Sequence, residues 1–199
     1  MKKIISPLLA LGMCITPVSA LLMVQPSWGQ TQNSQAQQAE RLLEQWLQQT
    51  QQQQHQQAIK TFQQVLTLAR ELKDKKLEAT ALLGLGFNFQ RIGELQQALD
   101  YYNQSLPLFR ALGDRTGEAT TLNNIGGVYS ALGQNQEALK FYNQSLPLFR
   151  ALGDRTGEAT TLNNIGGVYS ALGQNQEALK FYNQSLPLFR ALGDRTGEA

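Results

Sequence analysis

Apolar residues recur at helical spacing in the stretch that follows Asp114. Leu122, Ile125, Gly126, Tyr129 and Leu132 share one face and predict a first helix of about four turns. Asp114 is placed to cap the start of this helix and Gly133 to end it. A second helix is predicted from about Gln136, with an apolar stripe made of Ala138, Tyr142, Ser145, Phe149 and Leu152. Pro147 lies inside it and is expected to kink or interrupt it, because proline lacks a backbone donor.

The resulting helical hairpin is repeated along the chain. Residues 111–150 and 151–190 are the same forty-residue string, and residues 191–199 begin it again. Self-similarity at this period predicts an all-α solenoid of stacked antiparallel hairpins, in which each unit buries its apolar face against its neighbours. Because a further unit has just begun at Ala199, we expect the chain to be a fragment of a longer array.

The pattern Ile125-Gly126, Tyr129 and Ala138 resembles the tetratricopeptide repeat. It returns forty residues later as Ile165-Gly166, Tyr169 and Ala178, and an earlier unit has Leu85-Gly86, Phe89 and Ala98. Arg150 stands where the family's closing proline is usual, and the second helix is longer by about two turns. Together with the stretch Leu122-Asn123-Asn124, these departures are similar to the long repeats of kinesin light chains.

The same register divides the chain into units. Residues 78–117, 118–157 and 158–197 are expected to be three repeats of an array truncated at residue 199. Residues 39–77 form a degenerate unit, and because Trp46 occupies its small-residue position we interpret it as a capping repeat. Residues 30–38 are a polar, Gln-rich linker.

Residues 1–29 have the features of a secretory signal peptide. Lys2 and Lys3 precede an uncharged apolar stretch, and small residues follow it between Ala20 and Gln30, where we expect cleavage. The protein is then exported to the periplasm or the extracellular space. The alternative is an uncleaved N-terminal membrane anchor, since about 20 apolar residues can span a bilayer; a membrane contact is expected only in that case.

Composition and charge exclude several classes of function. The net charge is +2, and each forty-residue unit is neutral, so the electrostatic footprint of a nucleic-acid-binding protein is missing. The single cysteine, Cys14, lies in the leader, and the single histidine, His55, is expected in a solvated turn without a partner. No catalytic, metal or cofactor constellation can be assembled from them, so we expect no enzyme activity, no cofactor and no small-molecule substrate.

We therefore expect a protein or peptide partner, bound along a groove that the first helices line. In a stacked array the first helices form the concave wall, and residues opposite the apolar face of each first helix point into it. Asparagine amides can donate to and accept from the backbone of an extended peptide. The predicted groove residues are Thr80, Phe87 and Arg91, then Thr120, Asn123, Asn124 and Gly127, and their copies Thr160, Asn163, Asn164 and Gly167.

Structural roles are the alternatives for these positions. The asparagines could bond only to neighbouring helices or water, and Phe87 could pack under the capping repeat. The pair Gly126 and Gly127 costs up to about 1 kcal/mol per residue in a helix, so we expect Gly126 to admit a packed neighbour and Gly127 to leave groove space.

A looser resemblance concerns the architecture. The leader, the Gln-rich start and the near-identical repeats with Ala-Leu-Gly-Asp-Arg are similar to the N-terminal half of cyanobacterial repeat proteins that end in a caspase-like CHAT domain. This resemblance implies an alternative function, as the regulatory arm of a cysteine protease whose catalytic residues lie beyond Ala199. A structural spacer without a groove ligand is the third possibility.

Overall fold

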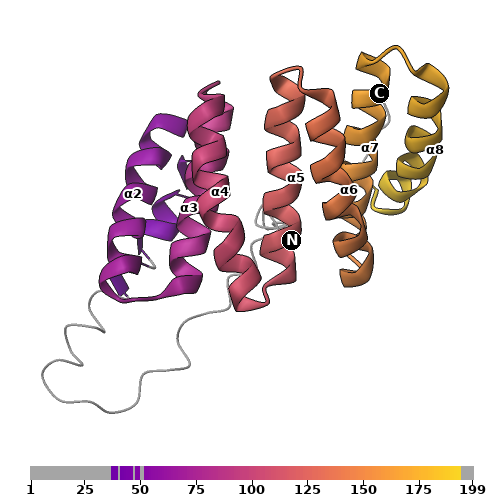
Figure 1. Cartoon of the computed structure of the whole chain (residues 1–199). Helices are drawn as coiled ribbons and strands as arrows, with labels where there is room; N and C mark the ends of the chain where they lie inside the picture. The colour runs from indigo at the N-terminus through magenta and orange to yellow at the C-terminus, as the bar shows by residue number, and fades with distance from the viewer. Residues whose placement is uncertain (1–36, 40, 47, 50–51, 194–199) are drawn as a thin grey trace, which may run out of the picture. The chain divides into compact units, whose positions relative to one another are not determined.

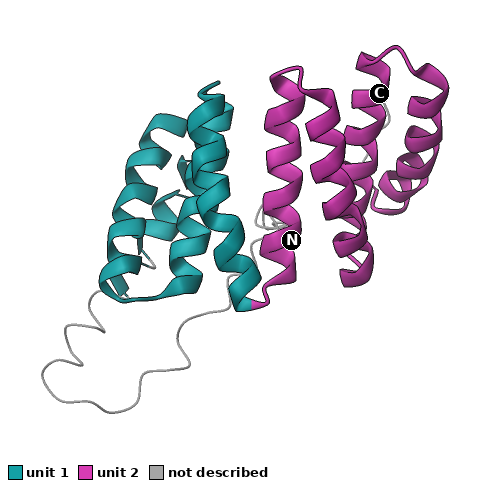
Figure 2. Cartoon of the chain, in the orientation of Figure 1, with its two compact units in different colours: residues 1–112 teal, residues 113–199 magenta. Residues whose placement is uncertain are grey.

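The computed structural model describes residues 37–39, 41–46, 48–49 and 52–193, and all regular secondary structure in these residues is helical. The predicted leader and residues 30–36 of the predicted linker lie outside the described residues, whereas residues 37 and 38 are helical. The chain divides into two compact units, residues 1–112 and 113–199 (Figure 2). Each unit is built from antiparallel helices that pack with their neighbours along the chain, which confirms the all-α, stacked-hairpin fold (Figure 1).

Unit 1 contains three complete helices, preceded by helical residues among 37–49. They are α2 (His55–Glu71), α3 (Lys75–Arg91) and α4 (Leu95–Leu112), and α3 packs against both of the others. Trp46 and Phe62 are fully buried at the centre of this unit, with ring centroids 4.7 Å apart. The Phe62 ring fills the space that Gly84 leaves on α3, because a Cβ atom on Gly84 would overlap this ring.

Unit 2 contains α5 (Arg115–Ala131), α6 (Asn135–Leu152), α7 (Arg155–Ala171) and α8 (Asn175–Ala191). Consecutive helices pack together, and the two first helices α5 and α7 also contact each other. Leu139 and Leu146 of α6 share one buried cluster with Leu162 and Ile165 of α7. The second helix of one repeat is therefore held against the first helix of the next.

The predicted helix ends are confirmed. The Asp114 and Asp154 side chains accept from the backbone N–H groups of Gly117 and Gly157, each at 2.9 Å. Gly133, predicted to end the first helix, follows α5 with a φ of 72°, and Gly153 follows α6 with a φ of 67°; glycine adopts this left-handed conformation at little cost. The turn that ends one repeat is thus followed at once by the cap of the next.

The prolines do not interrupt the second helices. Helix α6 runs without a break through Pro147, as α4 and α8 do through Pro107 and Pro187. Proline leaves the carbonyl four residues earlier without its helical donor. For Pro147 this residue is Asn143, which is exposed, so water can satisfy the carbonyl.

Glycine and tyrosine fit together in the hairpins α3–α4, α5–α6 and α7–α8. A Cβ atom on Gly126 would lie 2.7 Å from the Tyr142 ring, and one on Gly166 would lie 2.6 Å from Tyr182. The same contact in unit 1 joins Gly86 and Tyr102, at 2.5 Å. The prediction that Gly126 admits a packed neighbour is confirmed, and the neighbour is the second helix of its own hairpin.

His55 corrects the sequence-based prediction of a solvated turn residue. It is the first residue of α2 and is partly buried, and its Nδ1 atom lies 3.0 Å from Oδ1 of Asn88. Asn88 is fully buried in α3 and donates its amide to the Gly84 carbonyl at 2.8 Å. The partner of His55 stands 33 residues away in the sequence, beyond the reach of local pattern analysis.

Candidate functional site

The predicted groove residues of unit 2 lie on the paired first helices α5 and α7. We call these residues the first-helix surface: Thr120, Asn123, Asn124 and Gly127 on α5, and Thr160, Asn163, Asn164 and Gly167 on α7. The opposite faces of both helices are buried, with Leu122, Ile125, Leu162 and Ile165 at most 1% exposed. The contact between α5 and α7 brings the two sets of residues into one surface within this unit.

Asn123 forms a bridge between the two helices. Its Oδ1 atom accepts from the Asn164 amide at 3.3 Å and lies 3.1 Å from the Thr161 hydroxyl. Thr161 can donate its single proton either there or to the Gly157 carbonyl, at 2.8 Å. Asn123 and Asn164 thus bond to each other across two neighbouring helices, which is the structural role that the sequence offered as the alternative to ligand binding.

Asn124 occupies the same repeat position as Asn164 but has different surroundings. Both side chains are partly buried. The Nδ2 atom of Asn164 donates to Asn123, whereas the Nδ2 atom of Asn124 is buried without a hydrogen-bond partner among the described residues. A buried donor without an acceptor costs about 1–3 kcal/mol, so Asn124 is the member of this surface with an unmet bonding capacity.

The α7 part of the surface offers open space and a further amide. Gly167 is exposed, and a Cβ atom there would meet only the Tyr182 hydroxyl, at 3.8 Å. Asn163 and Thr160 are partly exposed, and within the described residues no hydrogen bond reaches the Asn163 side chain. Thr120, by contrast, is only 8% exposed. The accessible polar groups are therefore richer on α7 than on α5.

The predicted residues of unit 1 lie on α3. Phe87 is partly buried and packs against the core cluster that contains Trp46 and Phe62, as its structural alternative describes. Thr80 donates its hydroxyl to the Lys76 carbonyl at 2.9 Å, and Arg91 is exposed at the end of the helix. Phe87 thus contributes to packing beside the capping helix and is only in part available to a ligand.

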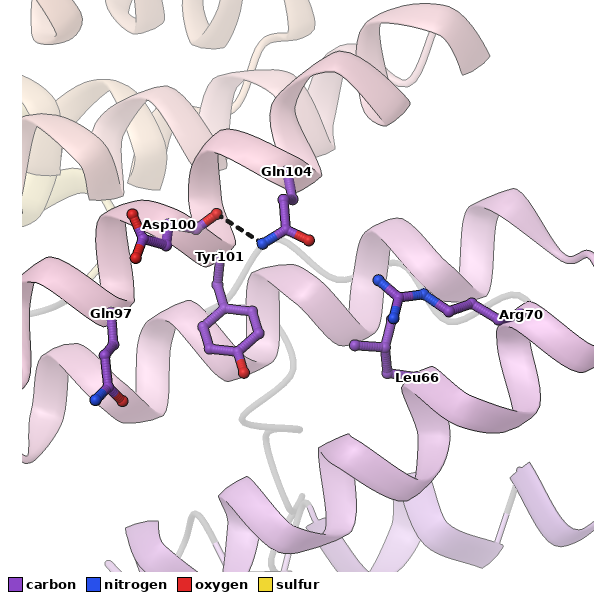
Figure 3. A pocket seen from close by; sticks show the side chains of 6 residues that line it. All are labelled: Leu66, Arg70, Gln97, Asp100, Tyr101 and Gln104. Atoms are coloured by element: carbon purple, nitrogen blue, oxygen red, sulfur yellow. Dashed lines mark hydrogen bonds between the residues drawn. The ribbon is translucent and has the colours of Figure 1, made fainter.

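A hollow that the sequence did not predict lies between the second helices α2 and α4 of unit 1. Its volume is about 380 Å³ (Figure 3). Leu66 and Arg70 line it from α2, and the residues from α4 are Gln97, Asp100, Tyr101 and Gln104. These residues lie about 30 positions apart in the sequence, so only the packing of α2 and α4 against α3 reveals the hollow.

A charge cluster lies beside this hollow. Arg70 donates from Nε to Glu78 at 3.0 Å, and Lys75 reaches the other carboxylate oxygen at 2.8 Å. Hydrogen bonds from Lys75 and Arg70, working against burial, hold the pKa of Glu78 below its ordinary value. The charge of Arg70 is therefore already matched within the unit.

The part of the chain that the structure describes contains no group of three or more His, Cys, Asp or Glu residues that could hold a metal ion. None of its helices is long and apolar enough to cross a bilayer.

The sequence matches the family model described as Tetratricopeptide repeat over residues 47–111 and 117–191. Among curated proteins, none matches the chain.

Several solved structures have a similar fold. Aspartyl phosphate phosphatase F from Bacillus subtilis is 14% identical with a TM-score of 0.75, over 81% of this chain and 42% of that protein. A Rap protein complexed with Competence and Sporulation Factor is 15% identical with a TM-score of 0.68, over 72% of this chain and 40% of that protein. A putative kinesin light chain of Podosopora anserina, with nearly identical TPR-like repeats, is 21% identical with a TM-score of 0.59, over 85% of this chain and 78% of that protein. The chain thus spans only about two fifths of the first two proteins.

Proposed function

Because the chain belongs to the tetratricopeptide repeat family, we propose that it is a scaffold that binds an extended protein or peptide segment along the first-helix surface. The observation that carries this proposal is the unpartnered amide of Asn124, on a surface where Thr160 and Asn163 are also partly exposed. An amide both donates and accepts, so it suits a peptide backbone, which offers the same groups in alternation. The Rap protein solved with a bound factor gives further support for a protein or peptide partner.

Asn124 can reach a ligand through its side-chain torsion. The last torsion of asparagine has broad minima, so the amide of Asn124, on a partly exposed residue, can reorient at little cost. A ligand carbonyl that accepts from Nδ2 then pairs a donor that the described residues leave unpaired. Asn164 gains less from such a ligand, because its amide already donates to Asn123.

Identical repeats favour a partner without strong side-chain selectivity. Residues 111–150 and 151–190 do not differ at a single position, so their first helices carry the same side chains. Distinct pockets for distinct side chains would require differences between the repeats. We therefore infer a repetitive partner, or one recognised mainly through its backbone.

The test compares two single substitutions of the same kind. Peptides are first selected from a random display library on the full chain and then titrated by fluorescence anisotropy. Asn124→Ala is expected to weaken binding about 2- to 13-fold, the equivalent of about 0.5–1.5 kcal/mol for one hydrogen bond, without lowering the melting temperature. Asn143→Ala is the control, because this asparagine is exposed on the second helix α6.

Two outcomes would contradict the proposal. Unchanged affinity together with a lowered melting temperature for Asn124→Ala would make this residue structural. Failure to select any peptide that distinguishes Asn124→Ala from Asn143→Ala would favour the spacer alternative. A caspase-like protease would require a Cys and a His downstream of Ala199, which sequencing beyond that residue tests.

We also propose that the protein is exported. Support comes from Lys2, Lys3 and the apolar stretch after them, all outside the described residues. N-terminal sequencing of the mature protein should find a start between Ala20 and Gln30. An intact Met1 in the membrane fraction would indicate the anchor instead.

A further inference from the structure

The hollow between α2 and α4 has a composition that the identical repeats do not reproduce. Two forty-residue periods further along the chain, the corresponding helices are α6 and α8. The lining residues that return there unchanged are Leu66, Arg70 and Gln104. The lining residues that differ are Gln97, Asp100 and Tyr101, where α8 has Glu177, Lys180 and Phe181. All the differences lie on the α4 wall, so this hollow can accept a ligand that the α8 residues would reject.

Asp100 places a negative charge without a counter-ion at one end of the hollow. The residue at the same position of α8 is Lys180, which pairs with Glu177 of its own helix at 2.6 Å. The Asp100 carboxylate accepts from the Gln96 amide at 3.4 Å and forms no ion pair with any described residue. Figure 3 shows this carboxylate pointing away from Arg70, which lies at the other end of the hollow. The Asp100 end therefore favours a cation.

Gln104 adds a neutral acceptor between these two ends. Its amide donates to the backbone carbonyl of Asp100 at 3.1 Å, the dashed line in Figure 3. In unit 2 its copy Gln184 accepts from Arg150 at 3.4 Å, but no hydrogen bond joins Gln104 to Arg70 among the described residues. The side-chain oxygen of Gln104 is therefore available to a donor on a ligand.

Tyr101 gives the hollow an aromatic wall. Its ring is partly buried and stacks on Phe89, with ring centroids 5.2 Å apart. It also packs against the core cluster that contains Leu66. An aliphatic chain can lie along this apolar surface, and an aromatic ring attracts a nearby cation. The Tyr101 hydroxyl, which Phe181 of α8 lacks, is a further acceptor.

We propose that the hollow between α2 and α4 binds a primary alkylammonium group, which a lysine side chain and a free aliphatic diamine both carry. Such a group donates three hydrogen bonds and accepts none. Asp100 supplies the opposite charge, and Gln104 and Tyr101 supply neutral acceptors. The apolar stem of the ligand lies against Leu66 and the Tyr101 ring. On α8 the same cation would meet Lys180 and be repelled. This site is separate from the first-helix surface of unit 2, and neither proposal depends on the other.

An NMR titration of the full chain tests the proposal, with the methyl groups of Leu66 as the reporter of the hollow. N-acetyl-lysine N-methylamide represents a lysine side chain, and cadaverine represents a free diamine. We expect saturable shifts with these probes, and the tighter one indicates whether the ligand is a peptide or a small amine. The uncharged norleucine analogue should bind about three- to tenfold more weakly than the lysine probe, because it lacks the ion pair and the cation–π contact.

Substitutions at Asp100 separate its charge from its shape. Asp100→Asn should weaken binding of the lysine probe about three- to tenfold, and Asp100→Lys, which introduces the residue of α8, should abolish it. The melting temperature should not fall in either variant, because Asp100 is exposed. Glu94→Gln is the matched control, since Glu94 is an exposed carboxylate of unit 1 that does not line the hollow.

Three results would overturn the proposal. The first is equal binding of the lysine probe by the wild type and Asp100→Asn, or equal binding of the lysine and norleucine probes. The second is tighter binding of N-acetyl-glutamate N-methylamide, because an acidic ligand would then be held through Arg70. The third is the absence of saturable shifts with both ammonium probes at millimolar concentrations.

Discussion

Units 1 and 2 share the way a hairpin is packed but differ in the polar contacts between helices. In both, a glycine of the first helix receives a tyrosine of the second. In unit 2 the first helices are joined by Asn123, at a position where the capping repeat of unit 1 has Leu43. Unit 1 instead joins α2 to α3 through His55 and Asn88, and at the equivalent contact of unit 2, between α6 and α7, Val168 stands in place of Asn88. The steric fit thus defines the repeat, while the polar links vary with the neighbours.

This difference has a physical basis. The glycine–tyrosine contact is made within one hairpin, so it is the same wherever the hairpin stands in the array. A bond such as that from Asn164 to Asn123 needs two successive repeats with matching residues. The degenerate capping repeat of unit 1 cannot supply that match, and the pair His55 and Asn88 forms the polar link there instead.

The largest expected effects are opposite changes in the free energy of unfolding, produced by substituting two glycines of unit 2. Gly126→Ala should lower the free energy of unfolding by about 1–3 kcal/mol, because its Cβ atom would lie 2.7 Å from the Tyr142 ring, which is only 2% exposed. Gly167→Ala should raise it by up to about 1 kcal/mol, because alanine favours the helix and nothing crowds the site. Chemical denaturation measures both.

Gly86→Ala extends this comparison to unit 1. The Cβ atom of the new alanine would lie 2.5 Å from the Tyr102 ring, so we expect a loss of stability similar to that of Gly126→Ala. A Gly126→Ala chain as stable as the wild type would mean that the tyrosine ring moves freely, and the shared steric fit would not define the repeat.

The next effect concerns the polar link of unit 1. His55→Leu should cost about 1–3 kcal/mol, because it leaves the buried Asn88 Oδ1 atom without its donor. Adding Asn88→Val gives the site the residue that unit 2 has, and removing both polar partners should recover part of the loss. A double-mutant cycle by urea denaturation measures the coupling. Strictly additive losses would show that the two side chains do not depend on each other.

Local patterns in the sequence predicted the helices, their caps and the role of Gly126. The caps depend on residues three positions apart, as for Asp114 and Gly117. The role of Gly126 followed from the cost of glycine in a helix, which implies a compensating contact. These inferences succeed because their causes lie within one hairpin.

Links between hairpins could not be predicted in the same way. The sequence around Asn123 and Asn163 is identical, yet one side chain accepts bonds from the next repeat and the other has none among the described residues. His55 was wrongly expected to lack a partner because Asn88 is contributed by a different helix. The groove positions themselves stay predictions until a ligand is tested.

The smallest expected effect is a dependence on pH in unit 1. The pKa of Glu78 is held below its ordinary value in the folded chain, mainly by the Lys75 and Arg70 hydrogen bonds. A carboxyl whose folded pKa is depressed stabilises the fold above its unfolded pKa, and this contribution disappears as the pH falls through the folded pKa. Glu78→Gln should therefore cost roughly 1 kcal/mol or less at pH 7, because both cations are more than half exposed.

At a pH below the folded pKa of Glu78 the Glu78→Gln chain and the wild type should approach each other in stability, because the wild-type carboxyl then becomes protonated. Urea denaturation at both pH values measures the difference. Glu137→Gln is the control, since its pair with Lys140 is exposed on both sides and should contribute little at either pH. A cost of Glu78→Gln that stays constant between the two pH values would show that packing of the side chain, and not its charge, stabilises this end of α3.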